Sequence, residues 1–187
     1  MKSGRIVGHV TDVPLQRYRM RKFIPFSMMF FLFCHIPVFG NASAEMSVTA
    51  VGTCDRTTID KHDLIAGAGS DLKSTYTSAS DQVLLSVSGS KGASDAWQVD
   101  IRRQDNNWDP RLKLSARRTN DGKGRQVSSG RSYHEVTNHN SAFFSGAGDV
   151  RDVKIRLKLS GVSVKIPPSS YSTMVYYTVR DLADVIK

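Results

Sequence analysis

The segment 105–109 has the residue types and spacing most typical of a ligand site. Asp105, Asn107 and Asp109 place side-chain oxygens at every second position, and Trp108 lies among them. Alternating oxygens in a loop are typical of calcium sites, and an amphipathic aromatic ring beside polar groups suits a sugar. A calcium loop also needs a glycine at its bend and a later bidentate glutamate, which this segment lacks. We therefore expect turn residues that bond their own backbone, with a glycan-binding loop centred on Trp108 as the alternative.

Two histidines, His134 and His139, are the next candidates for site chemistry. The zinc-protease motif places its histidines four residues apart, so that both face one side of a helix and bind one metal. A separation of five residues puts them on opposite faces of a strand, or about 140° apart on a helix. The sequence therefore predicts neither a metal nor a cofactor at this pair.

Two glycine-containing segments, 66–71 and 145–149, resemble each other. A phosphate-binding loop needs a strand before it and a helix after it, and no helical pattern follows either segment. We predict that both are loops at one end of the fold. Because no Ser/His/Asp set and no pair of carboxylates stands out elsewhere, we expect a protein that is not an enzyme.

The clearest strand pattern in the chain lies near the C-terminus. From 153 to 159, apolar residues alternate with lysines and arginines, as in a strand with one buried and one exposed face. The alternation shifts by one residue at Ser160–Gly161, which predicts a bulge, or a turn followed by a second strand at 162–166. Pro167–Pro168 ends that strand, and a last strand follows at 171–179.

The rest of the chain after residue 44 shows strand patterns separated by turn residues and no convincing helical period. Strands are predicted at 45–54, 57–59, 72–77, 82–88, 96–103, 112–117 and 131–137, with a helical turn near 60–65 and turns at 105–107 and 120–124. Seven to nine short strands indicate an all-β antiparallel sandwich or barrel, and an Ig-like sandwich is favoured. Its two inner faces are predicted to hold Trp97, Leu114, Phe143, Leu157 and Val175.

The first 44 residues have the three-part form of a secretory signal. Basic residues precede an apolar run at 23–39, and the small residues of 41–44 predict cleavage before Glu45. A membrane anchor is the alternative, although the run is short for a span and contains two prolines and a histidine. A start at Met20 would also give a normal signal, so the status of residues 1–19 is open. Residues 45–187 are predicted to form a single domain without a stable membrane span.

The charge of the chain is partly the charge of this leader. The whole sequence has a formal net charge of +9, but the first 44 residues hold six of its 26 basic residues and one of its 17 acidic residues, which leaves about +4. This excess predicts solvated strand faces rather than a nucleic-acid partner. Arg102–Arg103 and Arg117–Arg118 are expected on neighbouring strands, where the two members of each pair point to opposite faces.

Cys54 is the one cysteine in residues 45–187, so that part of the chain has no internal disulfide. In an oxidising compartment such a thiol is either buried or paired with another chain.

The closing segment 161–179 reads Gly-Val-Ser-Val-Lys-Ile-Pro-Pro-Ser-Ser-Tyr-Ser-Thr-Met-Val-Tyr-Tyr-Thr-Val. It resembles the final strands of bacterial surface-fibre subunits, the pilin-like sandwiches of the chaperone–usher and spore-coat-U type. The resemblance implies an N-terminal donor strand, for which Met46, Val48 and Ala50 are the candidates unless they pair within their own domain. It also implies a disulfide, and this chain differs from the family in that Cys54 is the single cysteine of residues 45–187.

Together these features predict an exported, non-enzymatic structural or adhesive protein of the periplasm or cell surface. Its partners would be other copies of itself or another envelope protein, bound by pairing of strand edges. The alternative is a secreted module that binds a glycan or another ligand through Trp108, Asp105, Asn107 and Asp109.

Overall fold

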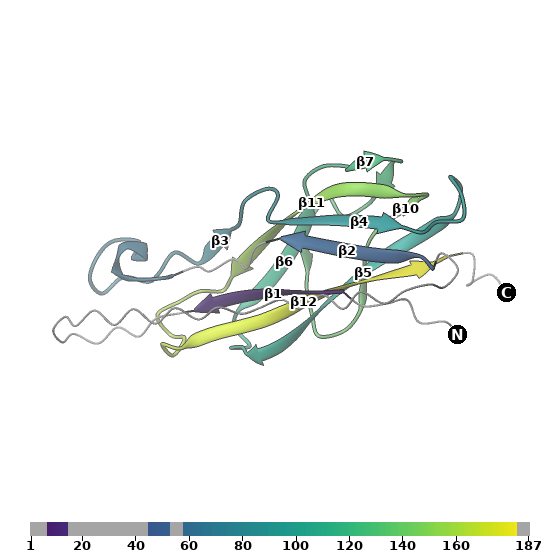
Figure 1. Cartoon of the computed structure of the whole chain (residues 1–187). Coiled ribbons are helices and arrows are strands. Elements are labelled where there is room, and N and C mark those ends of the chain that lie inside the picture. The colour runs from purple at the N-terminus through teal and green to yellow at the C-terminus, as the bar shows by residue number, and fades with distance from the viewer. Residues whose placement is uncertain (1–6, 15–44, 53–57, 183–187) are drawn as a thin grey trace.

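The computed structural model describes residues 7–14, 45–52 and 58–182, which form two antiparallel sheets packed face to face as a β-sandwich (Figure 1). The first sheet has the order β1-β12-β5-β10-β8, formed by Val7–Pro14, Ser170–Asp181, Ala96–Asn107, Ser141–Ala147 and Val127–Ser128. The second has the order β2-β4-β11-β6-β9, formed by Ser47–Gly52, Val83–Ser88, Val150–Ser160, Lys113–Arg118 and His134–Glu135. Two short strands also pair with β11, namely β3 (Thr75–Thr77) and β7 (Lys123–Gly124). The predicted all-β antiparallel sandwich is confirmed.

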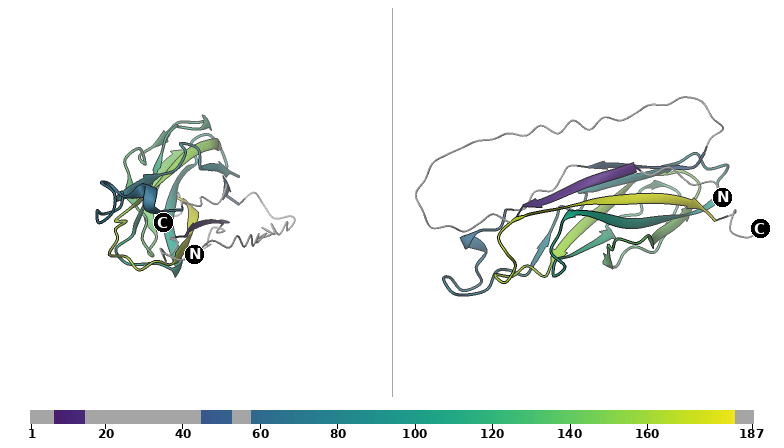
Figure 2. Two further views of the ribbon diagram at one scale, coloured as in Figure 1. Left: turned by 90° about the vertical axis from the view of Figure 1, so that its left-hand side faces the viewer. Right: turned by 90° about the horizontal axis from the view of Figure 1, so that it is seen from below.

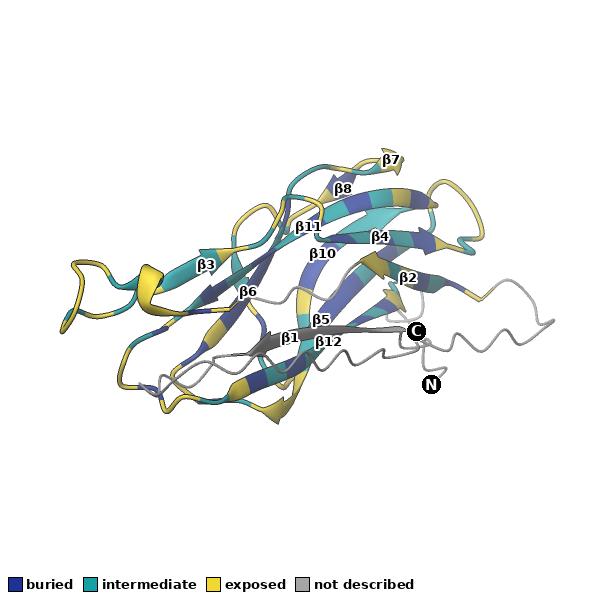
Figure 3. Ribbon diagram, turned by 60° about the vertical axis from the view of Figure 1, so that its left-hand side comes forward, coloured by how far each residue is buried: buried dark blue, intermediate teal, exposed yellow. Residues whose placement is uncertain are grey.

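The core forms where the alternating strand patterns of the two sheets meet. Buried and less buried residues alternate along β11 and β12, as Figure 3 shows. The five residues predicted for the inner faces are all buried in one cluster: Trp97, Leu114, Phe143, Leu157 and Val175. A smaller cluster around Leu112 and Tyr171 closes one end of the sandwich.

The strand β5 is longer than its sequence pattern predicts. The turn expected at 105–107 is instead the last part of β5, because β12 pairs with it as far as Ser172 opposite Asn107. Hydrogen bonds along a long neighbouring strand here outweigh the low strand preference of Asp and Asn. The short helical turn near 60–65 is present as a 3₁₀ turn, η1 (Lys61–Asp63), capped by Asp60.

The chain turns after β11 and does not form the predicted second strand at 162–166. Gly161 has a φ of 83°, and a Cβ atom there would lie 2.1 Å from the carbonyl oxygen of Arg111. Only glycine fits a position that is both left-handed and this crowded. Ser160–Gly161 therefore ends the strand, and the prediction of a strand beyond it is wrong.

Residues 162–166 form a loop whose apolar alternation comes from packing on the second cluster. Val162 and Ile166 are buried there, while Val164 between them is exposed. Asp71 accepts hydrogen bonds from the Val164 amide at 2.9 Å and from the Ser163 hydroxyl at 3.1 Å. An alternating pattern thus arose in a loop that is anchored by a distant carboxylate.

The strand β10 includes residues that the sequence predicted as loop. A register shift between Ala142 and Phe144 lets Phe143 and Phe144 both be buried. Gly146 then lies against the Trp97 ring, where a Cβ atom would come within 2.7 Å. The expectation that 145–149 forms a loop is therefore wrong for 145–147, because this glycine serves close packing in a strand rather than a turn.

Candidate functional site

The outer edge of β12 is the feature of the fold best suited to pairing with another strand. One side of β12 pairs with β5, and the other side pairs with β1, from Val7 opposite Tyr177 to Pro14 opposite Ser170. Figure 2 shows β1, in purple, running alongside the yellow β12. The sequence assigns β1 to a leader that is removed, and that assignment stays a prediction.

The two sheets pack on each other through side chains that come after β1 in the chain. Among the residues whose burial the structure describes, the two buried clusters extend from Met46 to Val179. Residues 7–14 pair with the outer edge of β12 beside this core. Without β1, the outward N–H and C=O groups of β12 would form an open sheet edge, which is a template for a further strand.

The residues of β12 hold this edge in a regular strand. Its inward positions are buried and alternate with half-buried outward positions from Tyr171 to Val179. The hydroxyl of the buried Thr173 has two acceptors for its proton on β5, the Gln104 carbonyl oxygen at 3.0 Å and the Asp105 carboxylate at 2.9 Å. These bonds fix β12 to β5, so the opposite edge is presented by a rigid element.

The candidate donor residues Met46, Val48 and Ala50 lie on or beside β2, which pairs with β4 from Ser47 opposite Ser88 to Gly52 opposite Val83. Met46 and Val48 are buried, and Ala50 packs against the core. Of the two alternatives that the sequence left open, the structure shows pairing within the domain. A donor role stays a prediction, and it would require β2 to leave β4.

The four residues of the predicted ligand loop are neighbours, but they face structural partners. Trp108 is half-buried, its indole N–H donates to the Leu112 carbonyl oxygen at 2.8 Å, and the Arg103 guanidinium lies 4.8 Å from its ring centre. Asp109 is buried and accepts from the Arg111 guanidinium at 2.6 Å and 2.8 Å. The Arg111 guanidinium holds the pKa of Asp109 below its usual range.

Asp105 and Asn107 at the end of β5 are also engaged within the fold. Asp105 bonds Thr173 and forms an ion pair with Arg103 at 3.5 Å. The Asn107 amide donates to the Ser170 carbonyl oxygen and to the Ser169 hydroxyl. The polar atoms of Asp105 and Asn107 therefore tie the end of β5 to the start of β12 and do not bond their own backbone as the sequence predicted, while the role of this segment as a glycan site stays a prediction.

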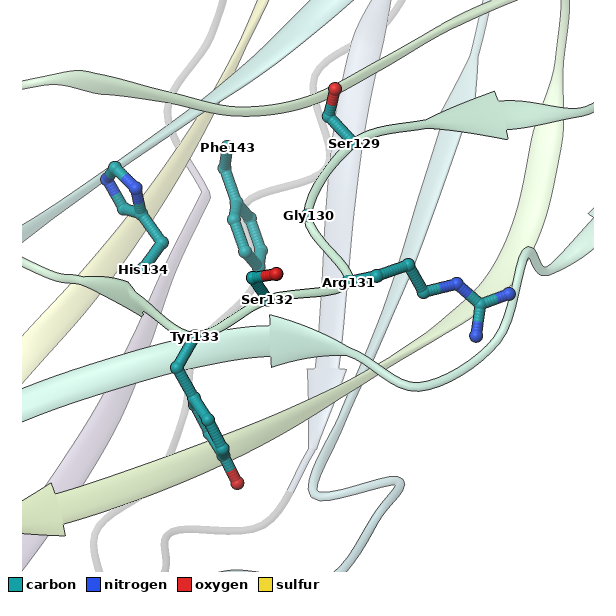
Figure 4. A pocket seen from close by; sticks show the side chains of 7 residues that line it. All are labelled: Ser129, Gly130, Arg131, Ser132, Tyr133, His134 and Phe143. Atoms are coloured by element: carbon teal, nitrogen blue, oxygen red, sulfur yellow. The ribbon is translucent and has the colours of Figure 1, made fainter.

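A hollow of about 370 Å³ lies at the loop between β8 and β9, lined by seven residues: Ser129, Gly130, Arg131, Ser132, Tyr133, His134 and Phe143 (Figure 4). His134 Nε2 is 2.7 Å from the Ser141 hydroxyl, which also lies 3.2 Å from the Ile101 carbonyl oxygen. The tautomer of His134 decides which of the two side chains donates to the other. His134 lines the hollow and Ser141 does not.

The two arginine pairs do not lie on neighbouring strands as the sequence predicted. Arg102 and Arg103 are on β5 in the first sheet, whereas Arg117 and Arg118 are on β6 in the second. Strands that follow each other in the chain here belong to different sheets. The members of the second pair differ in burial, since Arg118 is 4% exposed and Arg117 is half-buried.

We expect acid to destabilise the 119–131 loop through Asp121. Hydrogen bonds from Arg118, and then from Arg131, hold the pKa of Asp121 below its usual range. The stability that this carboxylate contributes is present above its unfolded pKa and is lost as the pH falls through its lower folded pKa. The melting temperature, measured at a series of pH values from 5 down to 2, should fall more steeply for the parent than for Asp121→Asn. Parallel curves for the two proteins would contradict this role.

Within the described residues, no group of three or more His, Cys, Asp and Glu side chains is placed to hold a metal ion. No helix in the same residues is long and apolar enough to cross a membrane. Cys54 lies outside the residues that the structure describes. Comparison with protein-family models, with curated proteins and with solved structures finds no match to this chain.

Proposed function

We propose that this chain is an exported, non-enzymatic surface or periplasmic component that assembles by β-strand addition at the outer edge of β12. The observation that carries this proposal is the position of β1, which covers that edge while belonging to the segment with the form of a cleaved signal. Cleavage before Glu45 would remove β1 and leave the two buried clusters formed by residues 46–179. Export and the opening of the edge would then be the same event.

The geometry supports a strand as the incoming group. Eight consecutive residues of β12, from Ser170 to Tyr177, pair with β1 in an unbroken antiparallel register. An added strand gains affinity from backbone hydrogen bonds and specificity from alternate side chains. The neighbouring sheet edge, β2, lies beside β1 and carries the exposed Val51, so a strand in this position contacts both sheets of the sandwich. The partner is another copy of the chain or another envelope protein.

The test is the size of the processed protein recovered from the cell envelope, by gel filtration with negative-stain microscopy. We expect residues 45–187 to form oligomers or filaments, and the uncleaved chain to remain a monomer because β1 covers the edge. A synthetic peptide with the sequence 7–14 should dissociate the assemblies by taking the place of the added strand. A processed chain that stays monomeric at all concentrations would overturn the proposal.

The matched control is the same peptide with proline at the positions of Val10 and Thr11. In an antiparallel ladder the N–H groups of successive residues point to opposite sides, so one of these two prolines removes a donor to β12. We expect this peptide to leave the assemblies intact. Equal action of both peptides would mean that dissociation does not come from strand pairing.

A further inference from the structure

The outward surface of the second sheet gathers five basic side chains on two adjacent strands. On β11 they alternate with the buried apolar residues, and on β6 they flank Ser115. The strands pair so that Arg156 is directly opposite Arg117, and Lys158 is opposite Ser115. We call this surface the basic face, formed by Lys113, Arg117, Lys154, Arg156 and Lys158.

Two of these cations have acidic partners, and the other three have none among the residues that the structure describes. Lys113 lies 3.4 Å from Glu135, and Lys154 lies 3.5 Å from Asp81. Arg117, Arg156 and Lys158 form no ion pair with a carboxylate in the part of the chain that the structure describes. These three adjacent positive charges are thus not neutralised by any carboxylate of the described segments.

The three unpaired cations are also held close together. The Tyr133 ring lies under two of them, with the Arg117 guanidinium carbon 4.9 Å and the Lys158 ammonium 4.2 Å from its centre. Like charges directly opposite each other in a sheet repel, and the Nε atoms of Arg117 and Arg156 are buried without a hydrogen-bond partner. An anion at this surface would not reach the buried Nε atoms, but it could accept hydrogen bonds from the outer nitrogens of both guanidinium groups and relieve the repulsion.

The shape of the basic face favours an extended polymer over a small anion. From Lys154 to Lys158 every second residue of β11 is a cation, which gives a spacing of about 6.6 Å. Cations on the two neighbouring strands are about 4.8 Å apart. Arginine forks match carboxylate and sulfate groups, which accept two parallel hydrogen bonds. The ring of Tyr133 is already occupied by two cations, so this face offers no free aromatic platform of the kind that single-stranded nucleic acids stack on.

We propose that the basic face binds an acidic polysaccharide that carries repeated carboxylate or sulfate groups. Arg117, Arg156 and Lys158 are its binding residues. The site lies on the sheet that does not contain β12, so it is independent of strand addition and is present in the uncleaved chain.

The test is binding of the full chain to immobilised polygalacturonate and dextran sulfate, with neutral dextran as the uncharged control. We expect binding to the two acidic polymers that weakens with added salt. The triple variant Arg117→Gln, Arg156→Gln, Lys158→Gln should lose about tenfold or more in affinity, as three modest charge contacts together supply. The charge-matched variant Lys61→Gln, Lys91→Gln, Lys165→Gln, with exposed lysines outside the face, should change affinity less than about threefold.

Folding and binding are separated by a single substitution. Arg156→Gln removes the repulsion with Arg117, so its melting temperature should equal or exceed that of the parent while its affinity for the acidic polymers falls. Equal losses of affinity in the two triple variants would overturn the proposal, because binding would then depend on the net charge of the protein and not on the basic face. Tighter binding of oligodeoxythymidylate than of polygalacturonate would also overturn it, by assigning the face to nucleic acid.

Discussion

Replacing Trp97 with alanine is expected to lower the free energy of unfolding by about 3–5 kcal/mol, the usual cost of truncating a buried tryptophan. Trp97 is fully buried, its indole N–H donates to the Gly148 carbonyl oxygen at 2.7 Å, and its ring meets Phe144 edge-on at 6.0 Å. Gly146 lies directly against the ring, so the alanine variant leaves a cavity that a backbone without a side chain cannot fill.

The measurement is chemical denaturation of the parent, Trp97→Ala and Trp97→Phe, with folding followed by far-UV circular dichroism. The phenylalanine variant keeps most of the ring volume and loses the indole hydrogen bond. Its free energy of unfolding should therefore fall clearly less than that of Trp97→Ala. A loss below about 1 kcal/mol for Trp97→Ala, the level of an ordinary surface substitution, would contradict the position of this residue at the centre of the core.

Replacing Arg118 with methionine is expected to cost about 3 kcal/mol, because it removes the donor of one buried and three part-buried hydrogen bonds. The Arg118 guanidinium donates to the carbonyl oxygens of Val127, Asn120 and Ser129, and to the Asp121 carboxylate. One buried side chain thus joins both ends of the 119–131 loop to β6. Loss of these bonds should free that loop as well as destabilise the fold.

Arg117→Met is the matched control for this change. Arg117 is the next residue on the same strand, but its side chain contacts Tyr133 on the outward surface and no buried carbonyl oxygen. We expect a loss within about 1 kcal/mol for this variant. Hydrogen exchange of the 119–131 amides should be accelerated in Arg118→Met alone, and similar exchange in the two variants would disprove the anchoring role.

Much of the sandwich was predictable because its strands have strong local patterns. The alternation in 96–103, 112–117 and 171–179 predicted β5, β6 and β12, and the inner-face residues Trp97 and Val175 followed from the same period. These segments need no information about their partners, since one buried and one solvated face already specify a strand.

The errors have one physical origin, which is contact between segments far apart in the chain. Asn107 belongs to a strand because β12 pairs with it, and Gly146 belongs to a strand because Trp97 needs close packing. The loop after Gly161 alternates because Val162 and Ile166 pack on a second cluster. Each local pattern was compatible with two structures, and a distant partner decided between them.

The candidate surfaces depend even more on pairing between strands. The alternation of Lys154, Arg156 and Lys158 was visible in the sequence, but the position of Arg117 opposite Arg156 follows only from the register of β6 with β11. The pairing of residues 7–14 with β12 was not predicted, because the leader pattern placed that segment outside the fold. Its content of valine and threonine was the one available signal.

The most direct test of strand addition is hydrogen exchange at the backbone amides of Ser170–Tyr177. About half of these N–H groups point to β5, and the others point to the outer edge. In the uncleaved chain and in assemblies of the processed chain, we expect both sets to exchange slowly. In the processed chain held as a monomer by dilution, the outward set should exchange fast while the set facing β5 stays protected. Equal exchange of the outward set in monomers and assemblies would contradict the account, because assembly would then leave the edge of β12 uncovered.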